Sequence, residues 1–372
     1  MTKFDKDKLI IGAAGPVLAL VSSFVLTVLV LLATGLDPIE PIRLMIDNAA
    51  YSDIQVLIVN QTGIYYLASL AVAVGFQMNL FNIGVDGQYR LAAMLSALVG
   101  AAVDLPGPLH ILLIVLVATA TGAFWAGIAG VLKTTRGVSE VVSTIMLNSI
   151  TTALVAWLIL PKNFGEQPAG SNNLTTGDIP ESGWFPGIDM GEGNGVIYGF
   201  TFVALALGVV YWFVLNRTRF GFDLRATGAS ESAAQASGVD AKKMILTSML
   251  ISGGLAGLSG MPTLLGETHT YSLDFPVGVG FTAIAIALLG RNHPVGILFA
   301  SLLFAFLEKA SSTLDTEGYP KEITEIMKGI IVIAVVVSYE LVRRYGLRRQ
   351  QQKVGEQLAA GGALTTDKEV AA

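Results

Sequence analysis

The 372-residue chain contains no cysteine, only three histidines and few charged side chains. Without cysteine, disulfide frameworks, thiolate metal sites and cysteine nucleophiles are excluded. The histidines, His110, His269 and His293, are too far apart in the sequence to predict a structural zinc site. Lys, Arg, Asp and Glu make up 14% of the residues, against about 25% in soluble domains. The net charge of −5 also disfavours nucleic-acid binding.

Catalytic and nucleotide-binding motifs are missing as well. The sequence has no G-x-x-x-x-G-K-[ST] loop to hold phosphates, no HExxH pair and no GxSxG turn. We therefore predict no catalytic residue, no metal site and no bound cofactor in this chain. If the protein takes part in an ATP-driven process, ATP and Mg²⁺ are expected on a partner subunit.

Long apolar runs dominate what is present, since 53% of the residues are hydrophobic and the mean hydropathy is +0.64. A bilayer core of about 30 Å is crossed by about 20 helical residues, and lipid requires the backbone to satisfy its own hydrogen bonds. The sequence predicts an all-α integral membrane protein with about ten transmembrane helices, some short or broken. The expected spans are 9–35, 60–80, 85–104, 109–132, 139–160, 196–216, 244–265, 276–290, 294–311 and 326–343.

The distribution of basic residues predicts the orientation of these spans. With the N-terminus inside, eighteen of the 23 Lys and Arg residues fall in cytoplasmic segments, Arg90 among them. Cytoplasmic loops carry such an excess. We expect a multi-pass protein of the plasma membrane, embedded in the lipid bilayer, with both termini cytoplasmic. Residues expected outside, or at outer span edges, are Arg43, Lys162, Lys309, Lys321 and Lys328.

No stretch is long and polar enough for a separate soluble domain. We expect a single transmembrane domain over 1–343, with an external loop at 161–195 and a cytoplasmic segment at 217–243. The tail, 344–372, is expected to be cytoplasmic and disordered.

Two polar clusters lie close to predicted spans. In the first, Asn82, Asp86 and Gln88 surround Gly84 and Gly87, which permit a sharp backbone turn. The cluster fits either an ordinary hydrated turn or a broken-helix element that shapes a translocation pathway.

In the second cluster, Glu140, Thr144 and Asn148 are four residues apart and share one helix face. Such a stripe faces other helices or water rather than lipid. It fits helix packing and pathway lining equally well.

Small residues in the seventh span predict close helix packing. They are Ser252, Gly253, Ala256, Gly257 and Gly260.

The cytoplasmic segment 217–243 predicts a short surface helix from Glu231 to Ser237. Ser230 is suited to cap its N-terminus, and Gly238 is suited to end it. A short helix between two spans is expected to dock a cytoplasmic partner.

The chain resembles the permease subunits of ABC importers of the ribose/branched-chain amino-acid superfamily, in the nucleoside or simple-sugar branch. The order and spacing of five motifs between residues 60 and 343 carry this resemblance. They are the stretches 82–88, 137–148, 228–239, 252–260 and 284–294.

The resemblance implies a heteromeric importer. Its members pair this kind of chain with itself or with a related permease, with cytoplasmic ABC ATPase subunits, and with an external substrate-binding lipoprotein. By this resemblance, the coupling helix that meets the ATPase would contain Gly228, Ser230, Glu231, Ala233, Ala234, Gly238 and Val239.

A path lined by amides and hydroxyls favours a small neutral polar solute, and the resemblance favours a nucleoside. A ribose- or glucose-like sugar is the alternative within the same superfamily. A stand-alone secondary transporter would need intramembrane carboxylates for ion coupling, and only Glu140 and Glu308, near span ends, argue for it. A membrane scaffold or sensor is the remaining alternative.

Overall fold

The computed structural model describes residues 6–33, 35, 37–320, 322–335, 337, 338, 341, 342, 344–346, 348 and 351. Residues 352–372 of the predicted disordered tail therefore lie outside the described residues. The chain divides into two compact units, Met1–Arg43 with Gly318–Ala372, and Leu44–Glu317. We call them unit 1 and unit 2. The single domain predicted from the sequence stays a prediction.

Unit 1 contains α1 (Lys6–Ala33) and a helical stretch at 322–335. Thr27 and Leu31 of α1 and Ile323 and Met327 of the second helix line a cavity of about 310 Å³. Toward the other end of α1, the Ser22 Oγ lies 3.5 Å from the Ser338 Oγ. The two helices therefore face each other over several turns.

The described residues are predominantly helical, and six helices are long and apolar enough to cross a membrane. They are α3 (Ser52–Gln77), α5 (Gly107–Arg136), α6 (Glu140–Leu158), α7 (Phe200–Arg217), the run Ala241–Thr268 and the run Pro294–Thr313. The run Ala241–Thr268 consists of α10 (Ala241–Leu258), α11 (Met261–Thr263) and the π-helical turn η2 (Leu264–Thr268). The run Pro294–Thr313 consists of α13 (Pro294–Ala310) and η3 (Ser311–Thr313).

Shorter helices complete the described part of the chain. They are α2 (Glu40–Asn48), which crosses the boundary of the units, α4 (Val85–Ala101), α8 (Arg219–Ala229), α9 (Glu231–Ala236), α12 (Val279–Leu289) and the 3₁₀ turn η1 (Glu181–Gly183). Each predicted span overlaps a helix, but α3 begins at Ser52 and not at residue 60. The sequence did not indicate that start, because Asp53 and Gln55 in the first turn of α3 interrupt the apolar run.

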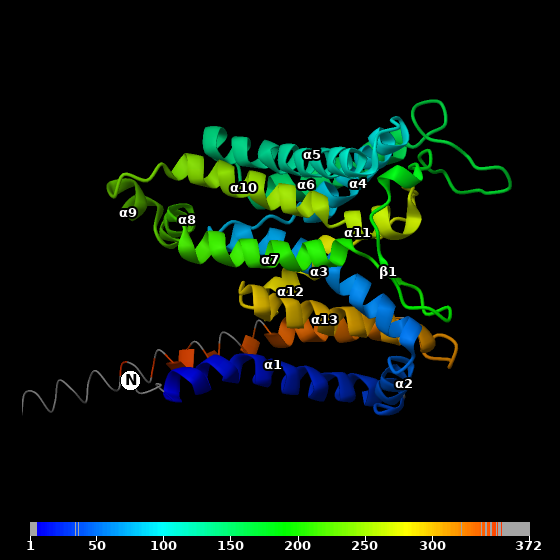
Figure 1. The fold of residues 1–372 in the computed structure, drawn as a ribbon. Coiled ribbons are helices and arrows are strands. Elements are labelled where there is room, and N and C mark those ends of the chain that lie inside the picture. Colours follow the sequence, from blue (N-terminus) through cyan, green and yellow to red (C-terminus); the bar gives the residue numbers. More distant parts are fainter. Residues whose placement is uncertain are drawn as a thin grey trace, which may run out of the picture. The chain divides into compact units, whose positions relative to one another are not determined.

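The centre of unit 2 is α3, which is buried at every position from Asn60 to Gly75. Helices α7, α10, α12 and α13 pack around it (Figure 1). The buried residues of α3 include the polar Asn60, Gln61 and Ser69. Its central place is therefore shown by its burial and its neighbours, and not by an unusually apolar composition.

Helices α5 and α10 approach each other through glycines. A Cβ added at Gly122 would lie 2.1 Å from the Gly253 carbonyl oxygen, and one at Gly257 would lie 2.2 Å from the Ala118 carbonyl oxygen. No side chain fits at these distances. The predicted small-residue run of α10 therefore lies against the backbone of α5.

The long loop between α6 and α7 is tied to the end of unit 2. It contains a hairpin of β1 (Ile188–Asp189) and β2 (Val196–Ile197), in which Ile188 pairs with Ile197. The Asn60 side chain of α3 donates to the Val196 carbonyl (2.8 Å) and accepts from the Tyr198 N–H (2.9 Å). The loop is thus held to the central helix.

Candidate functional site

Residues 78–84 form the turn that connects α3 to the start of α4 within unit 2. The Asn82 and Gln88 side chains exchange two hydrogen bonds of 2.9 Å. Asn82 also accepts from the Gly84 N–H (3.1 Å) and donates to the Ser252 hydroxyl of α10 (2.9 Å). Asn82, Gln88 and Ser252 are all buried. Because buried amides need partners, these bonds fix the turn.

Asp86 connects α4 to α12. Its carboxylate accepts from the Gly278 N–H (2.7 Å) and the Gly280 N–H (3.4 Å), which are free donors at the start of α12. A negative charge at a helix N-terminus is stabilised by the helix dipole. A Cβ at Gly280 would lie 2.5 Å from the Asp86 backbone nitrogen. Glycine therefore allows the two helix starts to meet.

Asn148 of α6 holds the same turn from the other side. Its amide donates to the Ile83 carbonyl and accepts from the Gly87 N–H, both at 2.9 Å. Thr144, one turn earlier, is fully buried against Gly84. We call Asn82, Asp86, Gln88, Thr144, Asn148 and Ser252 the buried polar network.

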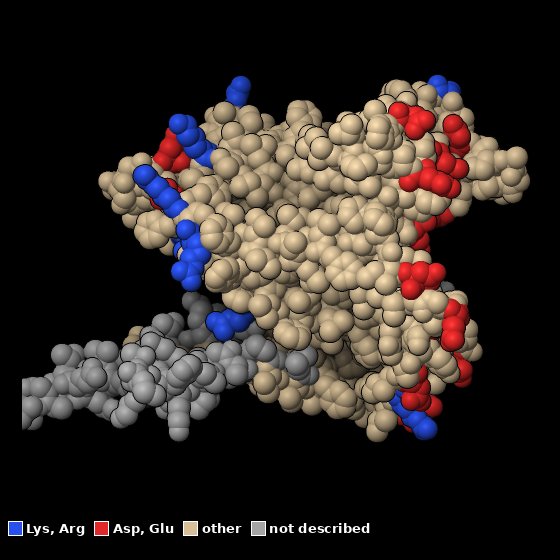
Figure 2. All heavy atoms as spheres, in the orientation of Figure 1, with Lys and Arg blue, Asp and Glu red and all other residues tan. Residues whose placement is uncertain are grey.

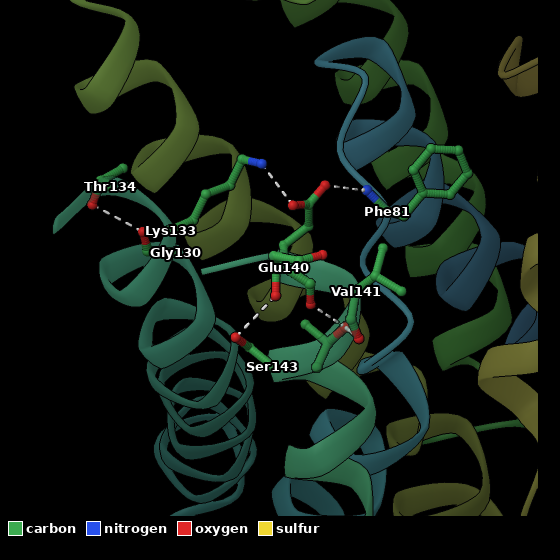
Figure 3. Close-up of polar contacts among 9 residues, drawn as sticks. Phe81, Gly130, Lys133, Thr134, Glu140, Val141 and Ser143 are labelled. Atoms are coloured by element: carbon green, nitrogen blue, oxygen red, sulfur yellow. Dashed lines mark hydrogen bonds and ion pairs between the residues drawn. The ribbon is translucent and has the colours of Figure 1, made fainter. Parts of the chain in front are cut away.

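Glu140 fastens the beginning of this turn (Figure 3). Its carboxylate lies 2.6 Å from the Lys133 Nζ of α5 and accepts a longer bond of 3.4 Å from the Phe81 N–H. The side chain of Glu140 is only 8% exposed, and the ion pair with Lys133 offsets the cost of removing its charge from water. Glu140 thus clamps α5, α6 and the turn together.

The structure thus brings the six predicted pathway residues together around one turn, hydrogen-bonded within the chain. Sequence reasoning missed the link from Asn82 to Ser252 and the caps that Asp86 supplies to α12. It counted Arg90 with the cytoplasmic residues, although the predicted span 85–104 contains it, and the structure places Arg90 in the second turn of α4.

The predicted short helix of the 217–243 segment is confirmed as α9. The Ser230 hydroxyl caps it by accepting from the Ala233 N–H (3.3 Å), and Gly238 ends it with a φ of +84°. Glu231, Ala233 and Gly238 are exposed, whereas Ala234 is buried. The exposed side of α9 is therefore available to another molecule.

Helix α8 joins α9 to the core. A Cβ at Gly228 would lie 2.5 Å from the Gln77 carbonyl oxygen, so the end of α8 rests on the end of α3. Val239, half-buried, donates its N–H to the Ala234 carbonyl at 3.0 Å. At the start of α10, the Asp240 carboxylate accepts from the Lys243 N–H, which lowers the pKa of Asp240. Among the described residues, no group of three or more His, Cys, Asp or Glu could hold a metal ion.

Residues 54–336 match the family described as branched-chain amino acid transport system / permease component. The guanosine ABC transporter permease protein NupP of Bacillus subtilis is 37% identical over 74% of this chain and 79% of its own length. The nucleoside ABC transporter permease protein NupB of Lactococcus lactis is 31% identical over 87% of this chain and 90% of its own.

The glucose ABC transporter permease protein TsgB13 of Haloferax volcanii is 30% identical over 89% of this chain and 88% of its own. No solved structure matches the chain significantly. The family match covers α3 to α13 and continues into the helical stretch at 322–335, and so includes the buried polar network and α9. The chain therefore belongs to the branched-chain amino acid transport system permease family.

Proposed function

We propose that this chain is the membrane-spanning permease subunit of an ATP-driven ABC importer for nucleosides. The observation that carries the proposal is the similarity to two permeases named for guanosine and nucleoside transport, at 37% and 31% identity over most of the chain. ATP hydrolysis belongs to a cytoplasmic partner. A second permease, or a second copy of this chain, completes the path, and an external lipoprotein delivers the solute.

The proposed topology has ten passes with both termini in the cytoplasm. Charge supports this orientation for unit 2. On the face drawn in Figure 2, Lys and Arg of unit 2 gather at the end that carries α8 and α9, whereas Asp and Glu gather at the opposite end, near β1. Because basic residues concentrate on the cytoplasmic side, α8 and α9 lie inside and the hairpin lies outside.

Helices α8 and α9 form the proposed docking site for the ATPase. Two observations support it: α9 is exposed on one side, and Gly228 rests on the end of the central α3. Ala233→Arg places a long charged side chain on the exposed side without touching the core. We expect it to separate ATP hydrolysis from uptake, whereas Thr135→Arg, at the exposed end of α5, leaves both intact.

We propose that the buried polar network shapes the path indirectly, by fixing the positions of the helices α4 and α12. Its residues set where α4 and α12 begin, because Asp86 holds the start of α12 and Asn82 and Asn148 hold the start of α4. Movement of either helix would have to carry this network with it.

A simple sugar is the second candidate solute, favoured by the 30% identity to a glucose permease over 89% of the chain. Uptake by cells that express the whole transporter decides between the two. Accumulation of radiolabelled guanosine, uridine or adenosine, competed by unlabelled nucleoside and not by glucose, is expected. Accumulation of glucose alone would overturn the nucleoside assignment, and uptake without a co-purifying ATPase would overturn the ABC assignment.

A further inference from the structure

Arg90 occupies an unusual position in α4. Its neighbours Tyr89 and Leu91 are buried, and its own side chain is half-buried. Its Nη1 donates to the Thr152 hydroxyl of α6 at 3.2 Å, and the side chain also meets the Tyr271 phenol. The buried Nε has no partner. A guanidinium has five N–H donors and no acceptor, so the terminal Nη groups, and not the buried Nε, keep donors for another molecule.

The contact with Thr152 gives the depth of Arg90. Thr152 is the thirteenth residue of α6, Glu140–Leu158, one of the six candidate spans. At 1.5 Å per residue, it lies about 18 Å from one end of the helix and about 9 Å from the other. A hydrocarbon core is about 30 Å thick. Arg90 is therefore held inside the apolar layer.

The exposed side of α6 has two chemically different edges. Ser149 and Thr152 carry the hydroxyls of one edge, with the apolar Ile145 one turn before Ser149 and Ala156 one turn after Thr152, and all four are exposed. Residues at these spacings share one helix face. The other exposed edge is large and apolar, and consists of Met146, Ile150 and Trp157. Arg90 lies beside the first edge. We call Arg90, Ser149, Thr152 and Ala156 the polar edge.

Lipid cannot cover both edges equally well. Met146 and Ile150 suit hydrocarbon, but a partly exposed guanidinium in the apolar layer is costly unless it faces protein or a water-filled cavity. No ion pair joins Arg90 to Asp86, one turn earlier, whose Oδ1 accepts from the Gly278 and Gly280 N–H groups. The polar edge therefore requires a polar environment outside this chain.

We propose that the polar edge lines the solute path and that Arg90 donates hydrogen bonds to acceptor atoms of the passing solute. The inference rests on the proposed function, because the path is where a permease holds a polar solute inside the bilayer. A residue with donors only selects for acceptors. In a nucleoside the acceptor is a base carbonyl or a ribose oxygen. Arginine pairs in this way with O6 and N7 of guanine in other complexes.

The absence of cysteine makes the path directly testable, because a single introduced cysteine is the only thiol of this chain. Thr152→Cys is placed in the complete transporter in membrane vesicles, with Ile150→Cys as the matched control on the apolar edge. A water-soluble thiosulfonate reagent should modify Thr152→Cys and not Ile150→Cys, and transported solute should slow the reaction. A Thr152→Cys that stays as unreactive as Ile150→Cys, with and without ATP, overturns the proposal.

Uptake by Arg90 variants tests the contact itself. We expect Arg90→Gln to lower uptake about tenfold, the effect of one hydrogen bond to a charged group, while the complex assembles and still hydrolyses ATP. Arg90→Lys should keep part of the uptake that Arg90→Gln loses. Arg136→Gln, at the exposed end of α5, should leave uptake unchanged. A larger loss for guanosine than for adenosine assigns the contact to the base carbonyl, and equal losses assign it to the ribose.

A purely structural role for Arg90 gives a different result. If Arg90 only balances the charge of Asp86, Asp86→Asn combined with Arg90→Gln restores uptake, which overturns the proposal. The assay uses whichever solute the wild-type complex carries. A transporter that carries glucose alone would contradict the nucleoside assignment and still leave the test of Arg90 intact.

Discussion

Unit 2 contains two neighbouring groups of polar side chains, joined through α4 and α6, and they differ in how their hydrogen bonds are used. In the buried polar network, Asn82, Gln88 and Asn148 bond to groups of the same chain. On the polar edge, Thr152 is exposed and Arg90 is half-buried. A buried, satisfied polar group stabilises a fold, whereas an exposed polar group on a membrane helix needs a polar neighbour outside that helix.

The largest effect on stability is expected for Asn82→Ala. It removes the partners of Gln88 and of the Gly84 N–H together, and leaving such buried groups unpaired costs about 3 kcal/mol. Thermal unfolding of the purified protein in detergent measures the change. Thr152→Ala, on the polar edge, should unfold at the wild-type temperature. Equal losses of stability in the two variants would erase the distinction between the two groups.

For Gly87→Ala we expect a smaller decrease in the free energy of unfolding, about 2 kcal/mol. The added Cβ would lie 2.7 Å from the Asn148 Oδ1 and 2.8 Å from the Thr151 Oγ1. The matched control is Gly329→Ala, because Gly329 is helical and exposed and has nothing within 4 Å of its added Cβ. That control should be neutral or stabilising. A Gly87→Ala variant as stable as wild type would mean that α4 and α6 can separate freely.

Asp86→Asn sharpens the same comparison, because it keeps an acceptor for the start of α12 and removes only the charge. The loss of the interaction with the helix dipole is worth about 1 kcal/mol. Chemical unfolding measures it, with Asp189→Asn as control, because Asp189 is exposed in the hairpin, accepts from the Gly191 N–H and does not lie at a helix start. Stability unchanged by Asp86→Asn would show that the hydrogen bonds to Gly278 and Gly280, and not the charge, hold α12.

The smallest effect concerns the loop at the hairpin end of unit 2. Burial lowers the pKa of His269, which stacks on Trp184 at 3.8 Å, although the nearby Asp178 opposes that shift. The folded protein therefore binds a proton at His269 less readily than the unfolded chain does. Stability should be constant above about pH 6.5 and fall as the pH drops below it.

His269→Phe keeps a ring for Trp184 and should remove that part of the pH dependence, as followed by melting temperature between pH 5 and 8. His110 is the contrasting histidine, since both of its ring nitrogens have partners, the Ser182 hydroxyl and the Gly100 carbonyl. The same pH profile in wild type and His269→Phe would contradict the role given to His269.

Helix positions could be predicted from the sequence because apolar length is a local property. The cap at Ser230 and the stop at Gly238 were predictable for the same reason, since each depends on a few neighbouring residues. The bond from Asp86 to Gly278 was not, because it joins residues 192 positions apart. Arg90 was counted as cytoplasmic from its charge alone, although the predicted span 85–104 contains it, and its contact with Thr152 of α6 could not be read from the sequence.

The contact between Gly228 and the end of α3 has a mechanical consequence. The backbone of α8 lies directly against the backbone of α3, with no flexible side chain between them. A displacement of α9 would therefore be transmitted through α8 to α3. Helix α3 cannot move alone, because α7, α10, α12 and α13 pack against it. A force applied to α9 would thus be distributed over the helices packed on α3 and would not be absorbed by local bending.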